Sequence, residues 1–66
     1  MSVTWYGPKI KPETEEDFSD TLFIETKTMG VLEGFYSNYG GWMYYHDDGN
    51  KEINWGEVIA WRYNYE

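Results

Sequence analysis

The side chains with the clearest chemical potential lie between residues 13 and 20, where five of eight positions are carboxylates: Glu13, Glu15, Glu16, Asp17 and Asp20. Closely spaced carboxylates can present a phosphate-like array of negative charge, which would attract the lysines and arginines of a partner protein. The alternative is a solvated loop that keeps a small, aromatic-rich domain in solution. The solvated loop is the more common use of such a run, and the net charge of the chain keeps the binding array as a hypothesis.

A second polar cluster contains one imidazole and several oxygen ligands: His46, Asp47, Asp48, Asn50 and Glu52. A calcium loop needs ligands at alternating positions over about twelve residues, closed by a glutamate. Here the spacing ends after Asn50, and Lys51 places a cation in the cluster. Asp-Gly between two β-prone runs is instead typical of a hairpin turn. We therefore expect solvated carboxylates at a turn and no metal site.

No constellation in the sequence indicates catalysis. The chain has no cysteine, and its single histidine, His46, has no nucleophile paired with it by a motif. None of the glycines forms a phosphate-binding pattern, because no glycine-rich loop precedes a helix. We predict that the protein is not an enzyme and requires no cofactor.

The tyrosines are the other candidate binding residues, because the six in the second half of the chain cannot all be buried in a domain of this size. They are Tyr36, Tyr39, Tyr44, Tyr45, Tyr63 and Tyr65. Exposed tyrosines beside acids are typical of a protein-binding face, although aromatic pairs across strands also stabilise a sheet that has no partner. The predicted partner-binding residues are therefore Glu13, Glu15, Glu16, Asp17, Asp20, Tyr36, Tyr39, Tyr44, Asp47 and Asp48.

The net charge limits the class of partner. Twelve acids against five bases give a formal charge of −7, which argues against direct contact with nucleic acid or an anionic membrane and favours a protein with a basic surface. Stacking of nucleobases on the aromatic side chains would need a positively charged groove, which five lysines and arginines do not readily supply. No apolar run approaches the roughly 20 residues that span a bilayer, and residues 1–6 lack the features of a secretory signal. We expect a cytoplasmic location.

The elements that must position these residues form one small domain over residues 1–66. A chain this short buries only about 60% of its unfolded surface, and without cysteine no disulfide can compensate. Four tryptophans, seven tyrosines and three phenylalanines supply large buried areas instead. We expect these aromatic side chains to hold the domain together.

Alternating β-prone runs separated by turn residues predict strands at 21–27, 31–37, 42–46, 51–54 and 57–63. Residues 12–20 are expected to form an acidic loop with at most one helical turn, and Gly34 indicates a bulge or a close approach of another element. The predicted fold is all-β: a single antiparallel meander of four to five strands, in a curled sheet or an SH3-like small barrel. The candidate core residues are Leu22, Ile24, Phe35, Trp42, Val58 and Trp61.

The order of landmarks resembles the domain of unknown function 551, a family of small phage and prophage proteins. The matching positions are Trp5, Pro8, Pro12, residues 21–26, residues 34–36, Gly41-Trp42 and residues 58–61. After the last tryptophan, residues 62–66 stand where the family has a proline-rich end. The family has no established activity, so the resemblance implies a phage-like origin, with the host cytoplasm as the location.

These observations favour a small acidic accessory protein of phage type that binds a host protein and inhibits a defence or nucleic-acid-handling factor. Two alternatives stay open. One is a small-ligand module or sponge with a cavity lined by Trp5, Trp42 and Trp55. The other is a structural subunit whose exposed sheet edges pair into a homodimer or a larger oligomer.

Overall fold

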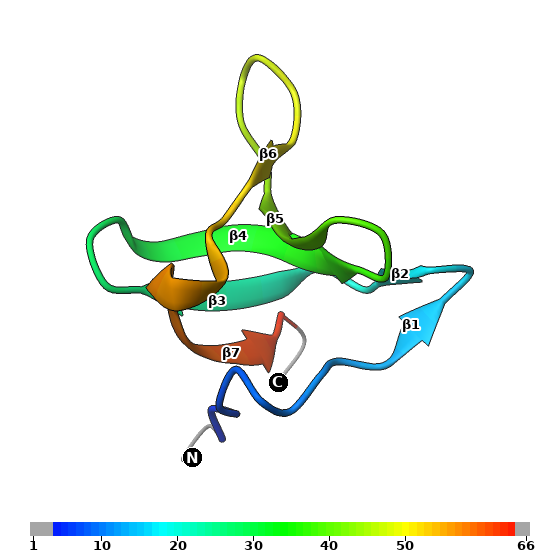
Figure 1. Cartoon of the computed structure of the whole chain (residues 1–66), viewed down its shortest axis with the longest axis horizontal. Coiled ribbons are helices and arrows are strands. Elements are labelled where there is room, and N and C mark those ends of the chain that lie inside the picture. The colour runs from blue at the N-terminus through cyan, green and yellow to red at the C-terminus, as the bar shows by residue number, and fades with distance from the viewer. Residues whose placement is uncertain (1–3, 65–66) are drawn as a thin grey trace.

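The computed structural model describes residues 4–64 (Figure 1). The elements in chain order are β1 (Thr14–Glu15), β2 (Phe18–Ser19), β3 (Leu22–Thr26), β4 (Gly30–Ser37), β5 (Gly41–Tyr44), β6 (Lys51–Glu52), a short 3-10 helix η1 (Trp55–Glu57) and β7 (Val58–Tyr63). The all-β prediction is confirmed. The five predicted strands correspond to β3–β7, and each observed end lies within two residues of the predicted one. No helix among the described residues is long and apolar enough to cross a membrane.

The strands form one antiparallel sheet built around β4. Strand β3 pairs with β4, β4 with β5 and β5 with β6, and β7 returns to pair with β3. Strand β2 pairs with the far end of β4, and β1 pairs with β2. Figure 1 shows how the sheet curls so that β7 lies below β3 and β4. This half-barrel confirms the predicted curled meander.

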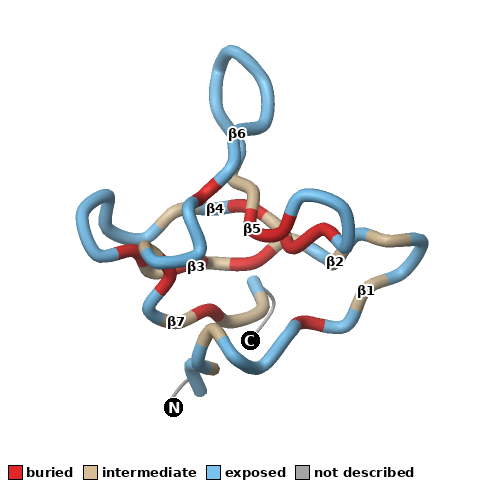
Figure 2. Tube along the Cα trace, in the orientation of Figure 1, coloured by how far each residue is buried: buried red, intermediate tan, exposed pale blue. Residues whose placement is uncertain are grey.

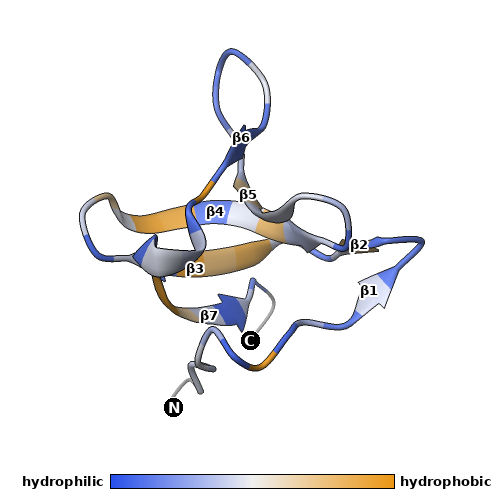
Figure 3. Ribbon diagram, in the orientation of Figure 1, coloured by the Kyte–Doolittle hydropathy of each residue, from blue (hydrophilic) through white to orange (hydrophobic). Residues whose placement is uncertain are grey.

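The core occupies the inner face of the half-barrel. Its buried members are Leu22, Ile24, Tyr36, Trp42, Ile53, Val58 and Trp61. Buried segments (red in Figure 2) lie along β3, β4, β5 and β7, and β3, β4 and the start of β7 carry the hydrophobic stretches that are orange in Figure 3. Trp42 is at the centre, with ring centroids 5.0 Å from Tyr36 and 6.3 Å from Trp61. Such ring pairs add about 0.5–1.5 kcal/mol each beyond burial, so aromatic packing substitutes for a disulfide.

One predicted core residue is wrong, because β4 turns its other face inward. The register pairs Leu22 with Gly34, so the inner face of β4 carries Gly34 and Tyr36. Successive side chains of a strand point to opposite faces. Phe35 therefore lies on the outer face, where it is half-buried, and Tyr36 is buried in its place.

The predicted close approach at Gly34 is confirmed. A Cβ at this position would lie 1.9 Å from the carbonyl oxygen of Met43 and 2.7 Å from the Cα of Tyr44. Only glycine leaves room for β5 to cross β4 here. The close packing of β5 against β4 therefore depends on Gly34.

A register shift in β7 explains how Val58 and Trp61 both enter the core although they are three residues apart. Thr26 pairs with Val58, but the preceding Glu25 pairs with Ala60, so the intervening Ile59 is the extra residue of a bulge. Ile59 is 43% exposed. Strict alternation would have placed Val58 and Trp61 on opposite faces.

The segment before β1 is fastened to β7 by backbone and side-chain hydrogen bonds. Tyr6 and Trp61 exchange both of their backbone hydrogen bonds, at 2.8 and 2.9 Å. The backbone N–H of Glu13 donates to the Tyr63 hydroxyl at 3.1 Å. The chain therefore reaches β1 from a fixed point on the core.

Candidate functional site

The acidic run forms a β-hairpin, which corrects the expected loop with a helical turn. Thr14 pairs with Ser19 and Glu15 with Phe18, across a two-residue turn. The turn residues Glu16 and Asp17 have φ angles of 52° and 76°. Two successive residues with positive φ give the turn geometry whose twist matches paired strands. The five carboxylates are thus held on a short, ordered projection.

The hairpin is anchored to the body of the sheet by the β2–β4 pairing and by several further hydrogen bonds. The backbone N–H of Tyr36 donates to Ser19 Oγ at 2.8 Å, and that of Asn38 donates to the Asp17 carbonyl at 2.9 Å. Asn38 Nδ2 donates to Thr14 Oγ1 at 3.2 Å, and the Tyr39 hydroxyl donates to Asp17 Oδ2 at 2.9 Å. These bonds fix the hairpin against the turn between β4 and β5.

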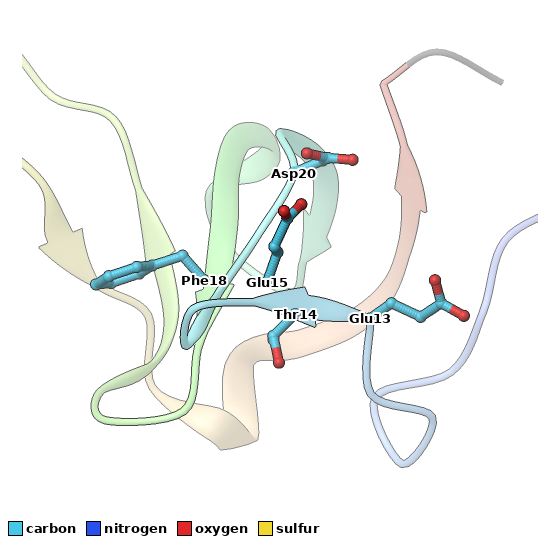
Figure 4. A pocket seen from close by; sticks show the side chains of 5 residues that line it. All are labelled: Glu13, Thr14, Glu15, Phe18 and Asp20. Carbon is cyan, nitrogen blue, oxygen red and sulfur yellow. The ribbon is translucent and has the colours of Figure 1, made fainter.

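A pocket with a volume of ≈ 280 Å³ lies on the hairpin. Its lining residues are Glu13, Thr14, Glu15, Phe18 and Asp20. In Figure 4 the carboxylates of Glu15 and Asp20 point to the same side of the hairpin, whereas Thr14 points to the other. Carboxylates accept charge-assisted hydrogen bonds from lysine or arginine. The arrangement suits contact with cationic side chains.

The carboxylates of the hairpin are not neutralised within the described part of the chain. Between residues 4 and 64, no lysine or arginine nitrogen lies within 4 Å of a carboxylate oxygen of another described residue. The one close histidine contact there is His46 Nδ1 to Asp48 Oδ2 at 4.0 Å. That nitrogen also accepts the Asp48 backbone N–H at 3.2 Å, and both residues lie in the β5–β6 connection rather than in the acidic hairpin. The negative potential of the hairpin therefore extends into solvent.

The ten predicted partner-binding residues divide into two separate groups and one buried residue. The hairpin group contains Glu13, Glu15, Glu16, Asp17 and Asp20, and the hydrogen bond to Asp17 brings Tyr39 to it. Tyr39 is 81% exposed. The second group, Tyr44, Asp47 and Asp48, belongs to the β5–β6 hairpin, whose tip projects away from the sheet and from β1 (Figure 1).

Tyr36 was expected to be exposed, and this is wrong: it is 5% exposed and packs against Trp42. Tyr44 is half-buried and contacts the His46 ring edge-on at 6.2 Å. Of the other tyrosines considered, Tyr45 is exposed and Tyr63 is half-buried, whereas Tyr65 lies outside the described residues. Within residues 4–64 no three His, Asp or Glu side chains are grouped so that they could hold a metal ion.

The three tryptophans expected to line a ligand cavity lie at different places. Trp42 is fully buried, and Trp55 packs edge-on against it with ring centroids 5.8 Å apart. Trp5 contacts the Arg62 guanidinium, which lies 5.3 Å from the ring centroid. The described residues therefore form no cavity lined by all three.

Sequence reasoning missed a row of three aromatic side chains on the outer face of the sheet, which begins at Phe18 in the hairpin. We call Phe18, Phe35 and Tyr45 the outer aromatic row. The ring centroids of Phe18 and Phe35 are 5.9 Å apart, and those of Phe35 and Tyr45 are 5.6 Å apart. The available signal was the alternation of side chains along a strand. Phe35 lies one residue from the core residue Tyr36, and Tyr45 lies one residue from Tyr44, which is partly buried and packs against the core.

Comparisons of the chain with protein-family models, with curated proteins and with solved structures found no match. The resemblance to the domain of unknown function 551 stays a prediction.

Proposed function

We propose that this chain is a small acidic binding protein of phage type, and that its β1–β2 hairpin engages a basic surface on a host protein. The observation that carries the proposal is the gathering of five carboxylates on one hairpin, none of which forms an ion pair within 4 Å with a lysine or arginine of residues 4–64. A surface that normally binds phosphate groups would offer the complementary lysines and arginines. The proposed target is accordingly a defence or nucleic-acid-handling factor, which the bound hairpin would inhibit.

The order of the hairpin favours binding. Association costs free energy whenever loops and side chains must be immobilised, and here hydrogen bonds to Asn38 and Tyr36 already fix the backbone. The exposed Tyr39 supplies an aromatic ring beside Asp17, and tyrosine is common among residues that dominate interface energies. Long-range attraction would speed association and weaken as salt screens the charges. The proposal includes no catalytic step.

The test is affinity capture from a bacterial host lysate at low and high salt, followed by binding measurements with the purified captured protein. The hairpin variant E13Q/E15Q/E16Q is compared with a control, D47N/D48N/E52Q, that loses the same number of charges at the β5–β6 hairpin. We expect the hairpin variant to bind about tenfold more weakly, a change of about 1.4 kcal/mol, and the control to bind nearly as the wild type. Equal losses of affinity in the two variants would show that net charge alone matters. Unchanged affinity of the hairpin variant would show that the hairpin does not contact the partner.

A further inference from the structure

The outer aromatic row crosses three strands on the outer face of the half-barrel. Phe18 comes from β2, Phe35 from β4, and Tyr45 directly follows β5. Phe18 is 50% exposed and Tyr45 46% exposed, with the half-buried Phe35 between them. The three rings thus form a continuous apolar strip rather than scattered surface side chains, and strips of this kind on small proteins commonly mark interaction sites.

Carboxylates border this row. Glu15 is the cross-strand partner of Phe18, so both side chains lie on one face of the hairpin. Asp20 and Phe18 line the same pocket. Glu33 precedes Phe35 by two residues on β4, and its carbonyl accepts the Tyr45 backbone N–H at 3.0 Å. The row is therefore apolar at its centre and negatively charged at its border.

We propose that the outer aromatic row is the docking site for an amphipathic segment of a partner protein, one that presents aliphatic side chains flanked by lysines or arginines. The charge complementarity of Glu15, Asp20 and Glu33 selects this occupant: a second copy of the chain, itself at −7, would meet like charges at the same border. A central aromatic anchor with a polar rim is the usual anatomy of an interface. The inference rests on the proposed function and adds the apolar contact that the hairpin carboxylates alone do not supply.

The test uses two short synthetic peptides of equal charge, one of alternating leucine and lysine and one of alternating serine and lysine. Each is titrated into the isotope-labelled full chain, and backbone amide shifts are followed by NMR. We expect the leucine peptide to bind about tenfold more tightly, with the largest shifts at Phe18, Phe35 and Tyr45. The binding of the serine peptide should disappear at high salt, because it rests on charge alone.

Two variants of the row, F18S and Y45S, are compared with M29S. Met29 is 44% exposed, close to the exposure of Tyr45, and lies in the turn between β3 and β4, at the end of the sheet away from β2 (Figure 1). Dispersed amide spectra establish that each variant is folded. F18S and Y45S should each lower the affinity for the leucine peptide about tenfold, whereas M29S should leave that affinity unchanged.

The other outcomes overturn the inference in distinguishable ways. If both peptides bind equally and the row variants bind as the wild type, the row is not a docking site, while binding of cations by the hairpin survives. If the amide shifts are largest at Met29 or elsewhere, or M29S is the variant that loses affinity, the peptide binds at a site other than the row. If neither peptide binds at low salt, the inference and the proposed function both fail.

Discussion

The indole nitrogen of Trp61 donates a hydrogen bond to the carbonyl oxygen of Ile10 at 2.7 Å, across 51 positions of sequence. The same N–H lies 3.1 Å from the carbonyl oxygen of Gly7. Trp61 is also a core residue: it is 2% exposed, and its ring contacts that of Tyr6 in a tilted arrangement with centroids 4.7 Å apart. One side chain therefore joins the segment before β1 to the centre of the half-barrel, and the two should unfold together.

Replacement of Trp61 by phenylalanine tests this joint role against a matched change at Trp42. Both tryptophans are buried, so each W→F substitution removes a similar volume. The Trp42 Nε1 hydrogen has no acceptor among the described residues, whereas that of Trp61 has two carbonyl acceptors. We expect W61F to lower the free energy of unfolding by about 1 kcal/mol or more beyond W42F, measured by urea denaturation. Faster amide exchange at residues 7–10 should accompany W61F alone, and equal losses in the two variants would contradict the anchoring role.

Gly34→Ala should be among the most damaging single substitutions. The added Cβ would meet the Met43 backbone, which cannot move without separating β5 from β4. We expect a loss of at least about 3 kcal/mol, which is a large share of the roughly 3–10 kcal/mol available to a domain of this length. Gly7→Ala is the control, because nothing lies within 4 Å of a Cβ there, and it should stay within about 0.5 kcal/mol of wild type. A folded G34A protein with a native urea midpoint would refute the close approach.

How much of this structure could be predicted from the sequence depends on what each residue type signals. The alternation of side chains correctly placed Leu22 and Ile24 on one face of their strand, and Phe35 and Tyr36 on opposite faces of theirs, because successive side chains of a strand point to opposite sides. It could not decide which of the two aromatics faces inward. That choice is made by the register between β3 and β4, a long-range feature. The same limit hid the outer aromatic row.

The acidic hairpin was missed for a different reason. Two-residue turns of this geometry usually have the sequence Asn-Gly or Asp-Gly, and the chain has Glu16-Asp17 instead. Non-glycine residues rarely adopt positive φ, so acids after a proline predicted a helical turn. The sequence shows the run of carboxylates itself, but the hairpin that gathers them follows from tertiary contacts such as Asn38 to Asp17.

That unusual turn leads to a stabilising substitution. Asparagine tolerates the left-handed region better than glutamate, so E16N should raise the free energy of unfolding by a few tenths to about 1 kcal/mol. Asp17 is kept because it accepts hydrogen bonds from Asn38 and Tyr39. The control is E15N, which removes the same charge from a strand position and should bring no gain. An equal gain from E15N in urea denaturation would trace the effect to relief of charge repulsion rather than to the turn.

Repulsion among the carboxylates should itself be measurable. The chain carries −7, and between described residues no lysine or arginine forms an ion pair with a carboxylate, so screening should favour the folded state. We expect sodium chloride, raised from about 0.01 to about 0.15 M, to increase the free energy of unfolding by up to about 1 kcal/mol as the Debye length shortens. The E13Q/E15Q/E16Q variant should gain less, because the hairpin holds fewer charges. A fall in stability with salt would mean that attractive charge pairs dominate, and the hairpin would then lack the free carboxylates that binding to a basic surface requires.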